Sequence, residues 1–91
     1  MSTVDQTLTN DWTKIADASE SFMLSVHGDT AIAVAYMDTE TAPTVTGHVL
    51  NARYYGAQGY VRANNIPPGF AYAKTMPPGH TAVVGLSVWT E

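Results

Sequence analysis

Cysteine is absent from the sequence, which excludes disulfide bonds and thiolate chemistry. Charge is scarce as well: Asp, Glu, Lys and Arg make up 13% of the 91 residues, against roughly 25% in typical globular chains. The four cations are scattered along the chain, at Lys14, Arg53, Arg62 and Lys74. Because binding to a nucleic-acid backbone needs clustered Lys and Arg, we expect no nucleic acid among the partners.

Long hydrophobic runs are also missing. No apolar stretch approaches the ~20 residues of a membrane-spanning helix. Residues 1–10 carry neither the basic nor the apolar region of a secretory signal. These absences predict a chain that is made in the cytoplasm and has no membrane partner. Its length fits a single domain with a thin core, because a chain of this size buries roughly 60–65% of its unfolded surface.

The sequence shows no cluster of reactive side chains. His27, His48 and His80 each adjoin a glycine, and no two of them have the i,i+4 or His-x-His spacing of metal ligands. The serines lack a Gly-x-Ser-x-Gly context, and Gly-rich phosphate loops are absent. We therefore expect no catalytic residue, no metal site and no cofactor. An enzyme would require a deep pocket with convergent polar groups.

Short alternating runs dominate the sequence instead. In residues 22–27 and 31–37 every second side chain is large and apolar: Phe22, Leu24, Val26, Ile32, Val34 and Tyr36. The two runs flank Gly28-Asp29, and this spacing predicts two paired antiparallel strands joined by a tight turn. Alanines fill most of the other positions of 31–37, and they predict a flat face that another layer or subunit approaches closely.

Two interpretations fit the region before this hairpin. Residues 12–16 have the pattern of a first short strand. Alternatively, Thr9, Asn10 or Asp11 caps a helix that runs to about Ala18. We favour the strand, because the rest of the chain has β patterns.

Further strands are expected over residues 45–55, 60–63, 71–74 and 81–89. The last of these is the most apolar and should lie in the centre of a sheet. Pro-Pro-Gly occurs at 67–69 and again at 77–79, which predicts two type II turns with positive φ at Gly69 and Gly79. Strands at this spacing predict an all-β fold, a small antiparallel β-sandwich or jelly-roll-like barrel of about seven short strands.

We expect a single β domain over residues 12–91, preceded by a flexible polar arm over residues 1–11. The low charge and many threonines fit either a surface that packs against other subunits or a Thr-rich soluble domain. Tyrosines crowded near arginines and asparagines fit core packing, a protein interface or a glycan site. The candidate interface residues are Val4, Leu8, Trp12, Tyr54, Tyr55, Tyr60 and Trp89.

The order of several short segments along the chain is also informative. These segments are residues 12–20, 22–26, 47–50 and 68–73, with a final alternating apolar strand after them. In this order the chain resembles short virion structural proteins of tailed bacteriophages, which include capsid decoration (cement) proteins, head fibres and small tail modules. The resemblance implies a small β-sandwich or jelly roll that assembles as a trimer or dimer on a capsid lattice, without catalytic residues.

The resemblance and the missing reactive groups favour a structural virion protein that decorates the outer surface of a phage head and stabilises it. The expected partners are the major capsid protein and further copies of the chain, because an oligomer multiplies modest contacts. The expected location is the capsid surface. The alternative is a tail or fibre adhesive module that binds a host glycan or protein through Tyr54, Tyr55, Tyr60 and Asn64.

Overall fold

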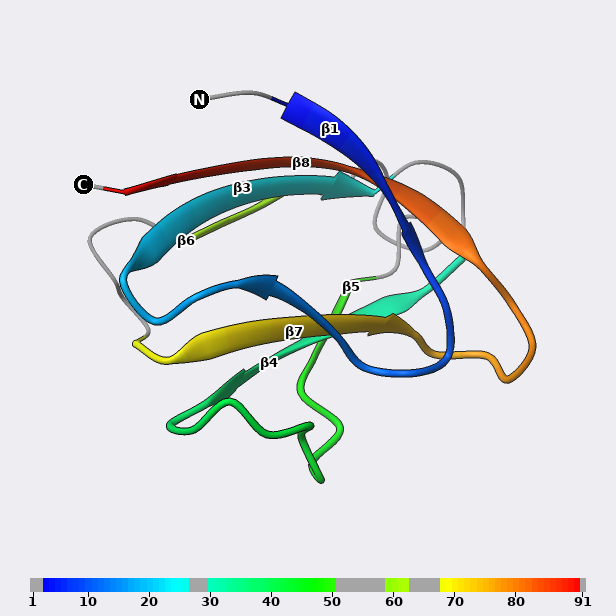
Figure 1. Ribbon diagram of the computed structural model, residues 1–91. Helices are drawn as coiled ribbons and strands as arrows, with labels where there is room; N and C mark the ends of the chain where they lie inside the picture. The colour runs from blue at the N-terminus through cyan, green and yellow to red at the C-terminus, as the bar shows by residue number, and fades with distance from the viewer. Residues whose placement is uncertain (1–2, 27–29, 51–58, 63–67, 91) are drawn as a thin grey trace.

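The computed structural model describes residues 3–26, 30–50, 59–62 and 68–90, with only the backbone for 59–61. These residues form two four-stranded antiparallel sheets packed face to face (Figure 1). The strands are β1 (Thr3–Leu8), β2 (Thr13–Ala16), β3 (Glu20–Val26), β4 (Ile32–Met37), β5 (His48–Leu50), β6 (Gly59–Arg62), β7 (Phe70–Thr75) and β8 (Ala82–Thr90). The described ranges contain no helix that could span a membrane. The predicted all-β sandwich is confirmed.

Each sheet combines strands from distant parts of the chain. One sheet, here called the β8 sheet, has the order β1-β8-β3-β6, and the other, called the β7 sheet, has the order β2-β7-β4-β5. Strand β8 pairs with β1 on one side and with β3 on the other, so that Leu86 lies between Val4 and Leu24. The prediction of a central C-terminal strand is therefore confirmed.

The core lies between the two sheets and follows the period-two alternation of the strands. In β3, Phe22, Leu24 and Val26 are buried, whereas Met23 is 52% exposed on the outer face. The buried apolar residues of the core are Leu8, Ile15, Ala16, Phe22, Leu24, Val26, Ile32, Val34, Ala71, Ala73, Ala82, Val84 and Leu86. The inward faces predicted from the sequence are therefore those that the core uses.

The predicted hairpin between residues 22–27 and 31–37 is wrong. Both segments contain strands, but β3 pairs with β6 and β8, while β4 pairs with β5 and β7. The chain thus crosses from one sheet to the other between them, and residues 27–29 of this connection lie outside the described residues. A period-two pattern specifies which side chains face the core but not which strand is the partner. Two strands that face each other across a sandwich fit the same pattern.

The N-terminal segment also differs from the expected flexible arm. Thr3–Leu8 is strand β1, which pairs with β8 from Thr3 opposite Ser87 to Leu8 opposite Ala82. Leu8 has no exposed surface and belongs to the core. Residues 3–8 are therefore part of the sandwich and add one strand to those expected.

Other local expectations have mixed outcomes. The helix considered for residues 9–18 is not formed, because Thr13–Ala16 is a strand that pairs with β7. The positive φ predicted for Gly69 and Gly79 is confirmed, with values of 109° and 77°. Within the described part of residues 45–55 only His48–Leu50 is a strand, and residues 51–55 lie outside the description.

A buried arginine ties several segments to the core. Arg62, the last residue of β6, has no exposed surface. Its terminal nitrogens donate hydrogen bonds to the carbonyl oxygens of Asp17 (2.7 Å), Glu20 and Gly69. The link before β3 and the turn before β7 are therefore joined to β6 through one side chain.

Candidate functional site

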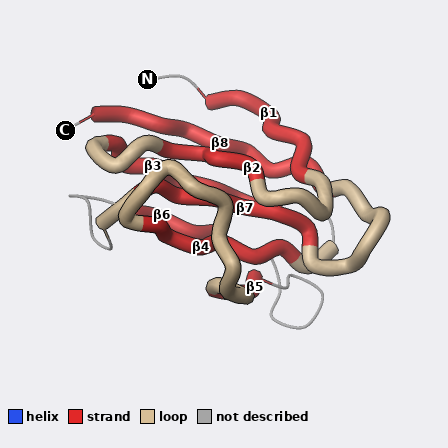
Figure 2. Tube along the Cα trace, turned by 60° about the horizontal axis from the view of Figure 1, so that its bottom comes forward, coloured by secondary structure: helices blue, strands red, loops and turns tan. Residues whose placement is uncertain are grey.

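The two outer faces of the sandwich differ in what covers them. The segment between β4 and β5, residues 38–47, runs across the outer face of the β7 sheet (Figures 1 and 2). Ala33 and Ala35 of β4 lie on that face, yet their exposed fractions are 0% and 1%. The flat alanine face predicted for β4 is thus approached by a layer of the same chain.

Several contacts hold this segment against the sheet. Glu40 accepts a hydrogen bond from the ammonium of Lys14 in β2, and Lys14 also pairs with Asp17 at 2.7 Å. The carboxylates of Asp17 and Glu40 raise the pKa of Lys14 above its ordinary range. Pro43 is buried. The segment is therefore anchored near both its beginning and its middle.

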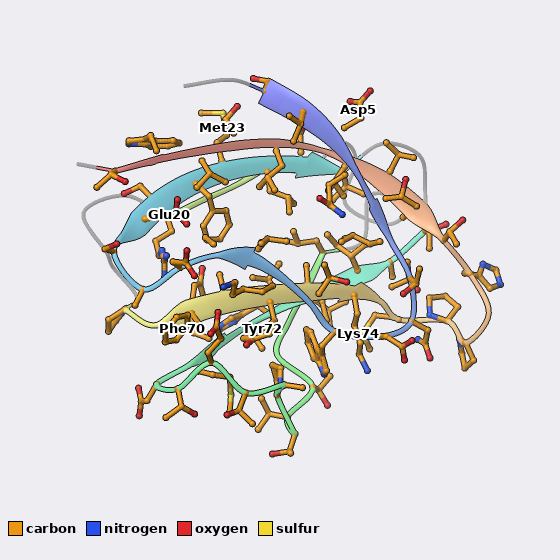
Figure 3. All side chains as sticks on the ribbon, viewed as in Figure 1. Asp5, Glu20, Met23, Phe70, Tyr72 and Lys74 are labelled. Atoms are coloured by element: carbon orange, nitrogen blue, oxygen red, sulfur yellow. The ribbon has the colours of Figure 1, made fainter. Side chains whose placement is uncertain are left out.

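A groove of about 320 Å³ opens between this segment and the end of β7. Its lining residues are Trp12, Pro43, Thr44, Val45, Thr46, Lys74 and Met76. Along β7, Phe70, Tyr72 and Lys74 point away from the core towards the covering segment (Figure 3). The groove volume is at the lower end of the ~300–1,000 Å³ typical of small-molecule sites, so it suits a ligand of about one ring.

The pairing of β2 with β7 brings Trp12 to Lys74. Thr13 lies opposite Ala73, which places the preceding residue beside Lys74. The ammonium of Lys74 lies 4.9 Å from the centroid of the Trp12 ring, a cation–π distance. Trp12 is half-buried, so part of its indole stays open to the groove.

Hydrogen bonds hold the link before β2 against the end of β7. The side-chain amide of Asn10 donates to the carbonyl oxygens of Thr75 and Met76, at 2.8 and 3.3 Å. The backbone N–H of Thr75 donates to the carbonyl oxygen of Thr9 at 2.8 Å. These hydrogen bonds therefore fix the position of the link that carries Trp12 relative to the end of β7.

Lys74 differs electrostatically from the other described cations. Lys14 is paired with two carboxylates, and Arg62 is buried among carbonyl oxygens. Within the described ranges Lys74 forms no ion pair, and the lining of the groove contains no Asp or Glu. Among the described residues, the ammonium of Lys74 in the groove therefore has no counter-ion.

Among the described residues, the outer face of the β8 sheet carries exposed apolar side chains around the buried Ser21, Gly85 and Ser87. Met23 and Val83 expose 52% and 40% of their surface there. The positions between them carry small groups, since Ser25 lies opposite Gly85 and Ser87 lies opposite Met23. Met23 and Asp5 both point away from the β7 sheet (Figure 3). This face is therefore low in charge and partly apolar.

The structure separates four of the predicted interface residues. Trp12 lines the groove, whereas Trp89 is half-buried in β8 opposite Ser21. Val4 is 51% exposed at the edge strand β1, and Leu8 is fully buried and offers no contact surface. These four residues therefore do not form one site.

The predicted tyrosine cluster falls largely outside the description. Tyr54, Tyr55 and Asn64 lie outside the described residues, and Tyr60 is placed by its backbone in β6 opposite Leu24. The glycan or protein contacts assigned to these residues stay a prediction.

The histidines lie in separate places. His48 begins β5 and His80 follows the second Pro-Pro-Gly turn, and both are exposed, while His27 lies outside the described residues. In the part of the chain that is described, no three His, Cys, Asp or Glu side chains lie close enough to hold a metal ion.

Sequence reasoning missed the groove and identified one of its residues, Trp12. The remaining lining residues come from the β4–β5 segment and from the end of β7, and no motif marks either. The register of β2 against β7 would have revealed the neighbourhood of Trp12 and Lys74, but register is a property of the assembled sheet. Comparison with protein-family models, with curated proteins and with solved structures gives no match to this chain.

Proposed function

We propose that this protein is a structural virion protein that decorates the capsid of a tailed bacteriophage and stabilises it. The contact surface is the outer face of the β8 sheet. The observation that supports the proposal is the composition of this face, where exposed Met23 and Val83 and half-buried Trp89 lie among small side chains, and Asp5 is the one charge among the described residues. A second protein would cover apolar area there with little charge to desolvate.

The size of the face suits such a contact. The molecule measures 32 × 27 × 20 Å, so one broad face is comparable with the roughly 800 Å² that each partner buries in a specific interface. Ser25 is small and exposed, so a partner can approach the backbone closely there. The proposed partners are the major capsid protein and one or two further copies of this chain, in the virion.

The test compares two valines that lie in strands of different sheets. Val83 is 40% exposed on the outer face of the β8 sheet, and Val49 is 48% exposed in β5 of the β7 sheet. Wild type, Val83→Asp and Val49→Asp are mixed with capsids that lack this protein, and the bound fraction is measured by co-sedimentation. We expect Val83→Asp to weaken binding by about tenfold or more and Val49→Asp to bind as wild type.

Melting curves of both variants verify that they are folded, and sedimentation velocity reports the oligomeric state of the free protein. A wild-type protein that stays monomeric and does not bind these capsids contradicts the proposal. Equal binding by Val83→Asp and wild type would show that the outer face of the β8 sheet is not the capsid contact.

A further inference from the structure

We propose that the groove between β7 and residues 43–46 binds a sugar acid, that is, a monosaccharide unit that carries one carboxylate. The carboxylate pairs with Lys74, and the sugar ring lies against Trp12. The groove is on the face of the sandwich opposite to the proposed capsid contact. Binding here is therefore independent of capsid decoration, and the two proposals are tested separately.

The charge of the groove selects an anion. The ammonium of Lys74 lies 4.9 Å from the Trp12 ring and has no carboxylate partner among the described residues. An ammonium has three donors and makes its strongest hydrogen bonds with anionic oxygens. Because the described lining contains no Asp or Glu, an incoming carboxylate meets the positive charge of Lys74 and no negative charge from the described residues.

The rest of the lining suits a hydroxylated ring. Thr44 and Thr46 are exposed and supply hydroxyl groups that both donate and accept hydrogen bonds. The indole of Trp12 adds an apolar surface and one N–H donor. Val45 and Met76 complete the wall with apolar contact for the C–H groups of a sugar ring. The volume of about 320 Å³ limits the ligand to about one such ring.

An acidic peptide side chain fits the same groove less well. The carboxylate of an Asp or Glu residue would pair with Lys74, but it would leave the threonine hydroxyls and the indole N–H without ligand partners. A neutral sugar would use the hydroxyls and the ring but would leave Lys74 without an anion. A sugar acid is the ligand class that pairs with Lys74 and also contacts the threonine hydroxyls and the Trp12 ring.

The groove is built before a ligand arrives. Asn10 joins the link that carries Trp12 to the carbonyl oxygens of Thr75 and Met76. The Lys14–Glu40 contact holds the covering segment on the sheet. A site whose walls are held by such contacts loses little conformational freedom when it binds, which favours affinity even for a small ligand.

Intrinsic fluorescence makes the binding test specific. The chain contains two tryptophans, and Trp89 lies in β8, so Trp89→Phe leaves Trp12 as the only indole reporter. This variant is titrated with glucuronate, with glucose as the neutral counterpart, and with the α-amide of N-acetylglutamate, which carries one side-chain carboxylate, as the peptide-like ligand. We expect a saturable change with glucuronate and binding about tenfold weaker for the other two ligands.

Two substitutions at Lys74, each made in the Trp89→Phe background, test the role of its charge. Lys74→Gln removes the ammonium and should weaken glucuronate binding by about tenfold, whereas Lys74→Arg keeps the charge and should retain it. The proposal is overturned if glucuronate gives no saturable change or if Lys74→Gln binds it as tightly as the parent. Equal affinity for glucose indicates a neutral-sugar site, and equal affinity for the α-amide of N-acetylglutamate indicates a peptide site. Either result overturns the assignment to a sugar acid.

Discussion

The guanidinium of Arg62 lies over the ring of Phe22 inside the core, with 5.4 Å between the guanidinium carbon and the ring centroid. The ring of Tyr36 lies 5.6 Å from the same carbon. A buried charge is costly unless its polar atoms have partners. Here two aromatic rings and three backbone carbonyl oxygens surround the cation, so a polar side chain stabilises one end of the sandwich.

Replacement of Arg62 by methionine should lower the free energy of unfolding by about 3 kcal/mol, because three carbonyl oxygens lose the donors that this buried side chain supplies. Arg62→Lys should be intermediate, since an ammonium keeps the charge but lacks the planar fork of donors. Urea unfolding at neutral pH measures both variants. A methionine variant as stable as wild type would show that these hydrogen bonds contribute little.

Substitution of Leu86 tests how much one buried side chain contributes to the stability of the thin core. It is 5% exposed in the central strand β8, and Leu86→Ala should cost about 2–5 kcal/mol. Its neighbour Val4 in β1 is 51% exposed, and Val4→Ala should cost only about 0.5 kcal/mol. Denaturant midpoints of the two variants provide the comparison. Equal losses at both positions would contradict the strand map.

Alanine substitutions at Gly47 and Gly79 distinguish the cost of backbone strain from the cost of steric overlap. Both have positive φ, 83° and 77°, but a Cβ at Gly47 would lie 2.6 Å from the carbonyl oxygen of Val34, whereas a Cβ at Gly79 meets nothing within 4 Å. We expect Gly79→Ala to cost about 1 kcal/mol from the backbone alone, and Gly47→Ala about 3 kcal/mol. Thermal melts compare them, and a Gly79→Ala loss equal to that of Gly47→Ala would argue against the close contact.

Lys14 has a pKa raised first by Asp17 and then by Glu40. The folded protein therefore keeps this proton above the ordinary lysine pKa of 10.5, at which the unfolded chain loses it. The stabilising contribution is complete below that pH and declines as the pH rises further towards the folded-state pKa.

The test follows the difference in urea midpoint between wild type and Lys14→Gln as the pH changes. We expect this difference to be constant from about pH 7 to about pH 9 and to shrink above about pH 10. Salt at about 1 M should also reduce it, because the pair is solvent-exposed. A difference that grows with pH would have the wrong sign for a lysine whose pKa is raised.

Only part of the candidate site could be predicted from the sequence. Trp12 is among the interface residues that are predicted from the sequence. Lys74 was noted only as one of four scattered cations. The pairing of β2 with β7 brings these two residues together. Residues 43–46, which lie about 30 residues after Trp12 and about 30 residues before Lys74 in the sequence, form the remaining wall of the groove.

Arg62 shows the same limit in the core. In the sequence it lies near tyrosines and asparagines, a composition that fits core packing, a protein interface or a glycan site. In the structure it is fully buried, because the ends of three segments bring their carbonyl oxygens to one point. No local sequence pattern predicts that carbonyl oxygens from separate segments meet around one arginine.

Local patterns in the sequence are enough to predict that the chain forms short strands, which apolar side chains share one face of a strand, and where Gly69 and Gly79 turn the chain. These are properties of neighbouring residues, since alternation and positive φ act within a few bonds. Local patterns do not predict that β3 and β4 lie in opposite sheets, that residues 3–8 join the sandwich as β1, or that Trp12 contacts Lys74. Each of these depends on contacts between distant segments, which form only when the whole core assembles.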